Sequence, residues 1–213
     1  MLKNKIMKIA ENQINTLRSY VNQSLRDIRN GLVHSQGSPN KQHGKAGEIA
    51  ISKLFNFRDE NGNLFDQNGN ACDIPKSVVE RSNLPKEFHH DIEIKFYEKK
   101  RKTFLMGDAI KKMEKIKNGL VLIVLFYDKA PCNVCDLKIV KVEPCKHESD
   151  FDRMAEIATF VKDRSNPIKG FGGTREKVRK ENAKLKTARF YLNDNSNSSS
   201  NTRQVQLCYK LNC

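Results

Sequence analysis

The sequence predicts an α/β fold in which amphipathic helices pack on a β-sheet. Residues 91–97 alternate charged and apolar residues with a period of two, as a strand with one packed face does. Residues 120–127 form an uninterrupted apolar run of strand length, which predicts a strand inside a sheet. Residues 5–33 repeat apolar residues every three or four positions, which predicts a helix. Together these segments indicate the fold class.

The first helix is expected over residues 5–33. Its apolar stripe consists of Ile14, Leu17, Val21, Leu25, Ile28 and Leu32. The pattern favours packing on the rest of the domain, and a dimer seam is the alternative. A Gly- and Pro-containing loop at 34–44 precedes a second helix, which begins near Lys45 and carries Glu48 beside its packed stripe.

The middle of the chain alternates turns with regular elements. Residues 58–72 are rich in Asn, Gly and Asp, which indicates turns. After the charged strand, residues 103–117 are expected to form a helix that ends at Asn118-Gly119. Residues 137–143 alternate again and predict a further strand.

The C-terminal third is more basic and more polar. We expect a helix from Ser149 to about Arg164, a strongly basic helix over 174–192, and a last strand over 203–211. Residues 193–201 are an Asn/Ser stretch of low complexity. The predicted division is an N-terminal helix and loop (1–42), a core (43–165) and a basic extension (166–213).

Composition favours a soluble, cytoplasmic protein. The 213 residues, 38% of them hydrophobic, suffice for one domain of ordinary size. No apolar run reaches the length of a membrane span, and the first residues lack the apolar block of a secretory signal. We therefore expect no membrane partner and reduced cysteines.

Four potential zinc ligands lie close together in the sequence: Cys132, Cys135, Cys145 and His147. The Cys-x-x-Cys spacing is that of a zinc knuckle, so a structural zinc site is one interpretation. The favoured alternative places the two nearer cysteines in a hairpin loop between two strands.

The chain is strongly basic and contains one acidic segment. Its net charge is +14 at pH 7. Residues 1–58 carry ten Lys/Arg against three acids, whereas residues 59–94 carry three against eight. Residues 95–117 (nine against three) and 166–192 (eight against two) are basic again. A basic surface favours binding of a polyanion such as nucleic acid. Carboxylates within that surface would repel phosphate unless a divalent cation lay between them.

Asp91, Glu93 and Lys95 share one face of the charged strand. Such groups on a packed strand are stabilised by pairing, by a metal or by a charged substrate. A solvated edge strand with salt bridges is the alternative. Asp73 and Glu93 from neighbouring strands are candidates to share a Mg²⁺ ion.

Three motifs stand in order: Gly44-Lys45-Ala46-Gly47-Glu48 on the second helix, then Cys72-Asp73-Ile74, then Glu93-Ile94-Lys95. Over residues 43–127 this order resembles the PD-(D/E)xK phosphodiesterase superfamily, the fold of most type II restriction endonucleases and of archaeal Holliday junction resolvases. The resemblance implies a restriction-endonuclease-like core, with a central mixed β-sheet flanked by helices.

By resemblance, Asp73 and Glu93 are the acids that share the metal, and Glu48 is a metal-binding acid for a second cation or orients the water of the first. Lys95 holds the attacking water and stabilises the pentavalent phosphorus. Two features depart from the family pattern. Cys72 stands where a proline is usual, and the 20-residue gap from Asp73 to Glu93 is long for a hairpin. Asp91 and Asp66 are therefore alternatives to Asp73, whose other possible role is a turn carboxylate that caps backbone amides.

The resemblance favours a Mg²⁺-dependent endodeoxyribonuclease that cuts double-stranded DNA at a specific sequence, as a homodimer of the restriction type. A Holliday junction resolvase or DNA-repair nuclease of the same superfamily is the first alternative, and a non-catalytic nucleic-acid-binding protein is the second. The expected DNA-contacting residues are Lys99, Lys100, Arg101, Lys102, Arg175, Arg179 and Lys180.

Overall fold

The structure is a computed structural model. It describes residues 6–34, 39–66, 72–99, 103–128, 133–142, 188–194 and 203–210. The chain divides into two units, residues 1–101 with 118–142 and residues 102–117 with 143–213, and each is described by itself. Within the described ranges, no helix is long and apolar enough to cross a membrane.

The first unit is built on a mixed four-stranded sheet, so the α/β class is confirmed. The strands are β1 (Ile6–Lys8), β2 (Asp91–Glu98), β4 (Leu120–Tyr127) and β5 (Val134–Val142), in the order β1-β5-β4-β2. β2 and β4 run parallel, whereas β5 is antiparallel to both β4 and β1. The predicted strands at 91–97 and 120–127 are confirmed, and the one at 137–143 begins three residues earlier than expected.

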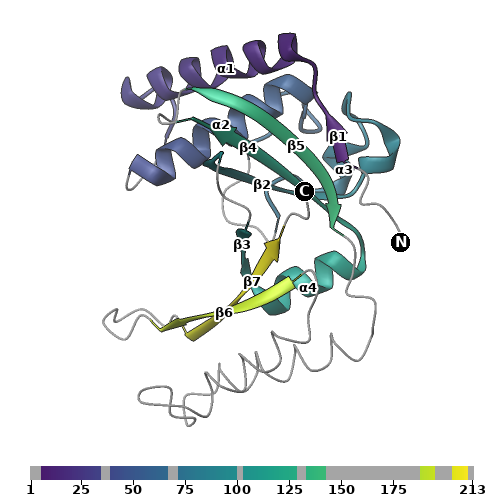
Figure 1. The fold of residues 1–213 in the computed structure, drawn as a ribbon. Coiled ribbons are helices and arrows are strands. Elements are labelled where there is room, and N and C mark those ends of the chain that lie inside the picture. Colours follow the sequence, from purple (N-terminus) through teal and green to yellow (C-terminus); the bar gives the residue numbers. More distant parts are fainter. Residues whose placement is uncertain are drawn as a thin grey trace, which may run out of the picture. The chain divides into compact units, whose positions relative to one another are not determined.

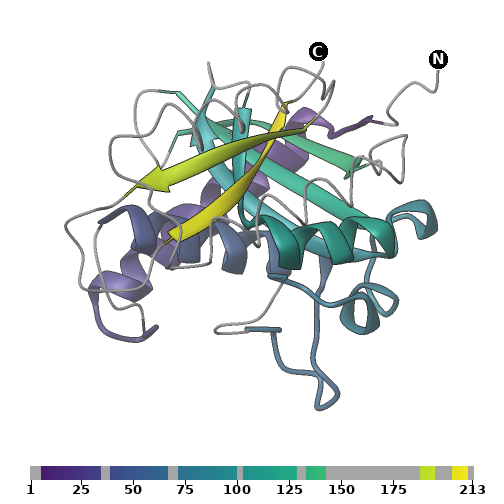
Figure 2. The ribbon, with the colours of Figure 1, turned by 90° about the horizontal axis from the view of Figure 1, so that it is seen from below.

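Helices α1 (Glu11–Arg29) and α2 (Pro39–Phe55) pack against each other on one face of this sheet (Figures 1 and 2). Five of the six stripe residues of α1 are buried, which confirms that the stripe packs on its own domain. Leu32 is the exception, with an exposed fraction of 75%. It lies beyond the end of the helix, where Gly31 adopts a φ of 73° and turns the chain away.

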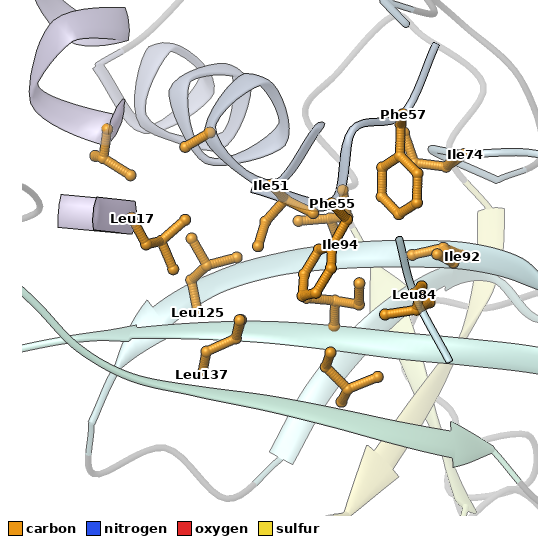
Figure 3. Close-up of a cluster of buried hydrophobic side chains, with 14 of the residues drawn as sticks. Leu17, Ile51, Phe55, Phe57, Ile74, Leu84, Ile92, Ile94, Leu125 and Leu137 are labelled. Carbon is orange, nitrogen blue, oxygen red and sulfur yellow. The ribbon is translucent and has the colours of Figure 1, made fainter. Parts of the chain in front are cut away.

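The core of the first unit lies between the two helices and the sheet. Figure 3 shows Leu17 of α1, Ile51 of α2 and Ile92 of β2 directed into it, together with Leu125 and Leu137. All five are at most 1% exposed. Since β4 buries residues 120–126 without interruption, it is covered on both faces, as its continuous apolar sequence predicts.

Two helix boundaries differ from the expectations. The predicted helix at 5–33 begins only at Glu11, because residues 6–8 instead pair with β5 as an edge strand. The second helix begins at Pro39 and not near Lys45. Proline suits the first turn of a helix, since the amide proton that it lacks has no partner there.

The long segment between the second and third motifs contains two short helices. After Ile74 come α3 (Lys76–Val79) and the 3₁₀ helix η1 (Lys86–Phe88). Ile74 forms an antiparallel bridge with Ile92 of β2. The length of the segment is therefore taken up by helical turns, and its start still lies beside β2.

In its described residues, the second unit has an antiparallel sheet of three strands, with the order β3-β7-β6, and one helix. Its elements are β3 (Thr103–Asp108), α4 (Ala109–Lys117), β6 (Ala188–Asp194) and β7 (Arg203–Lys210). The predicted helix at 103–117 is wrong for its first six residues, which pair with β7 as a strand. The predicted strand at 203–211 is confirmed.

The expected basic helix at 174–192 is wrong at its C-terminal end, because residues 188–194 form β6 and pair with β7. Residues 174–187 lie outside the described ranges, as does the expected helix from Ser149 to Arg164.

Candidate active site

Glu93 and Lys95 lie on the face of β2 opposite to Ile92 and Ile94, which belong to the core. Glu93 is buried, with only 4% of its surface exposed. Its carboxylate accepts a hydrogen bond from the Lys95 ammonium group. β2 lies at the edge of the described sheet, where ion pairs are usually exposed to solvent. Because Glu93 is buried, this ion pair differs from such exposed pairs.

Asp73 lies beside this ion pair. Its backbone N–H donates to the Ile92 carbonyl at 2.9 Å, and its Oδ2 accepts a hydrogen bond from the Ile94 N–H at 2.6 Å. The carboxylate thus caps a backbone amide, as the alternative role proposed. The same hydrogen bond holds the Asp73 carboxylate next to Glu93. Asp73 can therefore cap the Ile94 amide and also belong to the same acidic site as Glu93.

The two alternatives to Asp73 have other partners. Asp91 accepts a hydrogen bond from the Lys76 N–H at the start of α3, at 2.8 Å. Asp66 forms an ion pair with Lys45 of α2. Of the three aspartates, Asp73 is the one that binds the backbone between Glu93 and Lys95.

Glu48 reaches the cluster from α2. A Cβ atom at the preceding residue, Gly47, would lie 3.7 Å from Cβ of Phe96, so the helix passes close to β2 at this point. Burial raises the pKa of Glu48 to about 7, and the Asp73 carboxylate adds to this effect against the opposing fields of Lys45 and Lys95. Glu48 therefore interacts electrostatically with both later motifs.

Lys95 remains charged in this environment. Burial alone would lower its pKa, but the carboxylates of Glu93 and Asp73 outweigh burial and raise the pKa above its ordinary value. Lys95 is thus a permanent cation that can donate hydrogen bonds, and it cannot act as a proton acceptor.

Lys45 is a member of the site that the sequence analysis did not single out as a functional residue. Its Nζ contacts Asp66 and lies 3.9 Å from Oε2 of Glu48, one helical turn away. Only 10% of its side chain is exposed. The spacing of three residues between Lys45 and Glu48 was visible in the sequence, but such pairs are common on solvated helix surfaces.

The side-chain types at this site fit a hard divalent cation, because carboxylate oxygens are the ligands that Mg²⁺ prefers. The repulsion between Asp73 and Glu48, which raises the pKa of the latter, is what a bound cation would relieve. Among the described residues, no group of three or more His, Cys, Asp or Glu side chains is arranged to hold a metal. Mg²⁺ commonly binds through one or two carboxylates, with water and substrate phosphate as its other ligands.

Two neighbouring histidines have structural contacts. His89 hydrogen-bonds through Nε2 to the Leu84 carbonyl at 2.7 Å. The ring of His90 packs so closely on Gly119 that a Cβ atom there would lie 2.3 Å from its Nδ1. Both residues lie between η1 and β2, outside any helix or strand.

Several expected residues lie outside the described ranges. They are the zinc candidates Cys132, Cys145 and His147 and the DNA-contacting candidates Lys100, Arg101, Lys102, Arg175, Arg179 and Lys180. Lys99 follows β2 and is exposed. Cys135 is half-buried in β5, and burial raises the pKa of its thiol.

No family model, no curated protein and no solved structure matches this chain. The assignment of function therefore rests on the chemistry of the site itself.

Proposed function

We propose that this protein is a Mg²⁺-dependent endodeoxyribonuclease with a PD-(D/E)xK site formed by Asp73, Glu93 and Lys95, assisted by Glu48. The observation that carries the proposal is the meeting of residues from three separate segments. Asp73 is held on the backbone of β2, Glu93 is paired with Lys95, and the pKa of Glu48 responds to both Asp73 and Lys95. A carboxyl group with a strongly raised pKa, as at Glu48, in a site with a half-buried lysine is typical of catalytic sites.

Asp73 and Glu93 are the residues that would hold Mg²⁺. The ion would act as a Lewis acid on the phosphate and would lower the pKa of a bound water molecule. The Lys95 ammonium would donate a hydrogen bond to the phosphate oxygen on which negative charge develops. Glu48, with a pKa of about 7, is suited to accept the proton of the attacking water near neutral pH. The water oxygen bonds to phosphorus while the bond from phosphorus to the ester oxygen breaks, and the departing ester oxygen takes a proton from solvent water.

Double-stranded DNA is the proposed substrate, and a restriction-type homodimer is the proposed form. The net charge of +14 supports a polyanionic partner, since neutralised phosphates release counterions. The acidic segment that contains Asp73 and Glu93 is enclosed in sequence by basic segments, which suits a cation that mediates between carboxylates and phosphate.

The test is to incubate the protein with linear plasmid DNA and with a synthetic four-way junction, each with and without Mg²⁺. Discrete plasmid fragments that require Mg²⁺ would support the proposal. Symmetric cuts in the junction alone would point to a resolvase of the same chemistry. Binding without cleavage under every condition would mean that the acid–lysine strand is structural.

The substitution Lys95→Ala is expected to abolish cleavage and to leave DNA affinity nearly unchanged, because one half-buried ammonium group contributes little to the contact with phosphates. Cleavage rate and duplex affinity should be measured on the same preparation. Lys76→Ala is the matched control, since it removes an exposed lysine that pairs with Glu80. A fully active Lys95→Ala protein would rule out the proposed role.

A further inference from the structure

Among the described residues of the candidate site, two lysines pair with carboxylates, and of these Lys95 belongs to the acid–lysine motif of β2. Lys95 pairs with Glu93, and Lys45 pairs with Asp66 while it also lies 3.9 Å from Glu48. The Lys45 side chain is 10% exposed, against 33% for Glu48 and 48% for Asp66. The ammonium group of Lys45 is therefore set between two carboxylates that are each more open to solvent than it is.

A second cation would need carboxylate ligands of its own in this site, and Glu48 and Asp66 are the two that Lys45 contacts. In two-metal sites the ions lie about 3.5–4 Å apart, and carboxylates hold both of them. Here an ammonium group already neutralises the carboxylates of Glu48 and Asp66 at short range. A second divalent ion at these two carboxylates would face the repulsion of a nearly buried positive charge.

The charges of the cluster lead to the same conclusion. Glu48, Asp66, Asp73 and Glu93 are four carboxylates, and Lys45 and Lys95 are two ammonium groups. When all of them are ionised, two negative charges remain, which a single divalent cation balances. A second ion would leave the cluster positive before any substrate has bound.

We infer that Lys45 takes the place of a second metal ion, so that the site binds one divalent cation and Glu48 acts on the water of that ion instead of binding a second one. This inference rests on the proposed function, because it concerns the metal of that site. It distinguishes between two roles for Glu48, namely ligand of a second ion and orienting group for the first. Lys45 is a positioning residue that acts through Glu48.

The test counts bound ions and does not depend on activity. Mn²⁺ is titrated into the metal-free full chain, and the bound fraction is obtained from the electron paramagnetic resonance signal of free Mn²⁺. We expect one ion for the unaltered protein and two for Lys45→Met, which keeps the length of the side chain and removes its charge. Lys76→Met is the matched control, since it breaks the exposed pair with Glu80, and its count should remain one.

A double variant locates the added ion. In Lys45→Met with Asp66→Asn the count should return to one, because the second site would need the Asp66 carboxylate. Two ions in the unaltered protein, or one ion in a folded Lys45→Met protein, would overturn the inference. If Lys45→Met did not fold, a count of two for the unaltered protein would still overturn the inference. No bound ion at all would overturn the proposed metal dependence, which is a different result from a count of two.

Discussion

Two aspartates near β2 have different hydrogen-bond partners, and the difference predicts different effects of the same substitution. Asp73 Oδ2 accepts from the Ile94 N–H, and Asp91 Oδ1 accepts from the Lys76 N–H. An asparagine keeps an acceptor oxygen at either position but removes the charge. We therefore expect Asp73→Asn to lower Mg²⁺-dependent cleavage by about 100-fold or more, and Asp91→Asn to leave it nearly unchanged.

Cleavage rates and calorimetric Mg²⁺ binding of the two variants test this assignment. Each variant is the control for the other, because both test an amide in place of a carboxylate that accepts a backbone hydrogen bond. Equal losses in the two variants would contradict the assignment of Asp73 as the metal-binding acid.

Ser24 is an unfavourable residue inside the packed face of α1. It is 1% exposed, and its hydroxyl has no hydrogen-bond partner among the described residues. A buried hydroxyl without a partner costs about 1–3 kcal/mol, so Ser24→Ala should raise the free energy of unfolding. Ser19→Ala, at an exposed position of the same helix, measures the gain from helix propensity alone.

Urea unfolding of both serine variants provides the comparison. The increase for Ser24→Ala should exceed that for Ser19→Ala by about 1 kcal/mol. An increase no larger than that of the exposed control would show that the hydroxyl is satisfied in solution.

Among individual residues, the sequence predicted those whose position follows from strand periodicity. Glu93 and Lys95 had to share a face of β2, because alternation leaves no other arrangement. Lys45 and Ser24 were not predicted as special, since a helix presents residues at every angle and burial depends on the neighbouring helix and sheet. Asp73 was predicted with Asp91 and Asp66 as alternatives, and only the backbone bridge to β2 distinguished it.

The start of β4 depends on a glycine that no other residue can replace without strain. Gly119 has a φ of 90°, and a Cβ atom there would lie 2.3 Å from Nδ1 of His90. Gly119→Ala combines backbone strain with a clash against a ring, so we expect a destabilisation of about 2–4 kcal/mol. Gly47→Ala is the control, because the nearest atoms there lie at ordinary contact distances of 3.7–3.8 Å.

Thermal and urea unfolding of the two glycine variants test the prediction. Gly47→Ala lies within α2, where alanine favours the helix, so its stability should be equal to or above that of the unaltered protein. A stable Gly119→Ala protein would mean that the β2–β4 connection adjusts without cost.

Elements with local signals were predicted well, and those that depend on distant partners were not. β4 and α1 carry their whole pattern within one segment. β3 pairs with β7, roughly 100 residues further along the chain, and residues 103–108 read alone as the start of the helix that continues in α4. The same holds for β6, whose basic sequence fits a helix until its register with β7 is known.

For the whole molecule, the sequence alone showed how charge is distributed along the chain. It did not show which charged side chains meet in the folded protein. The acidic segment at 59–94 contributes Asp66, Asp73 and Glu93 to one cluster with Glu48. Sequence could not show that Lys45 enters this cluster, because the bend that brings Asp66 to α2 comes from tertiary packing. It also could not show that the chain divides into two units, each composed of separated segments.

The raised pKa of Glu48 predicts how the stability of the protein depends on pH. Its pKa is about 7 in the folded protein against an ordinary value of 4.5. Between these values the folded state holds a proton that the unfolded state releases, so the free energy of unfolding falls as pH rises through this window. The drop is on the order of 1–2 kcal/mol after allowance for solvent screening, since a third of the side chain is exposed.

Glu48→Gln removes the ionisation and should abolish this drop. In metal-free buffer the variant should match the unaltered protein near pH 4 and exceed it in stability near pH 8, as measured by urea unfolding at both values. Glu80→Gln, which changes an exposed carboxylate on the same unit, is the matched control. Saturating Mg²⁺ should narrow this difference at pH 8, because a bound cation offsets the repulsion from Asp73, which adds to the larger effect of burial. A difference in stability between Glu48→Gln and the unaltered protein that appeared only below pH 5 would contradict the predicted direction of the Glu48 pKa shift. It would mean that the folded state favours the ionised carboxylate.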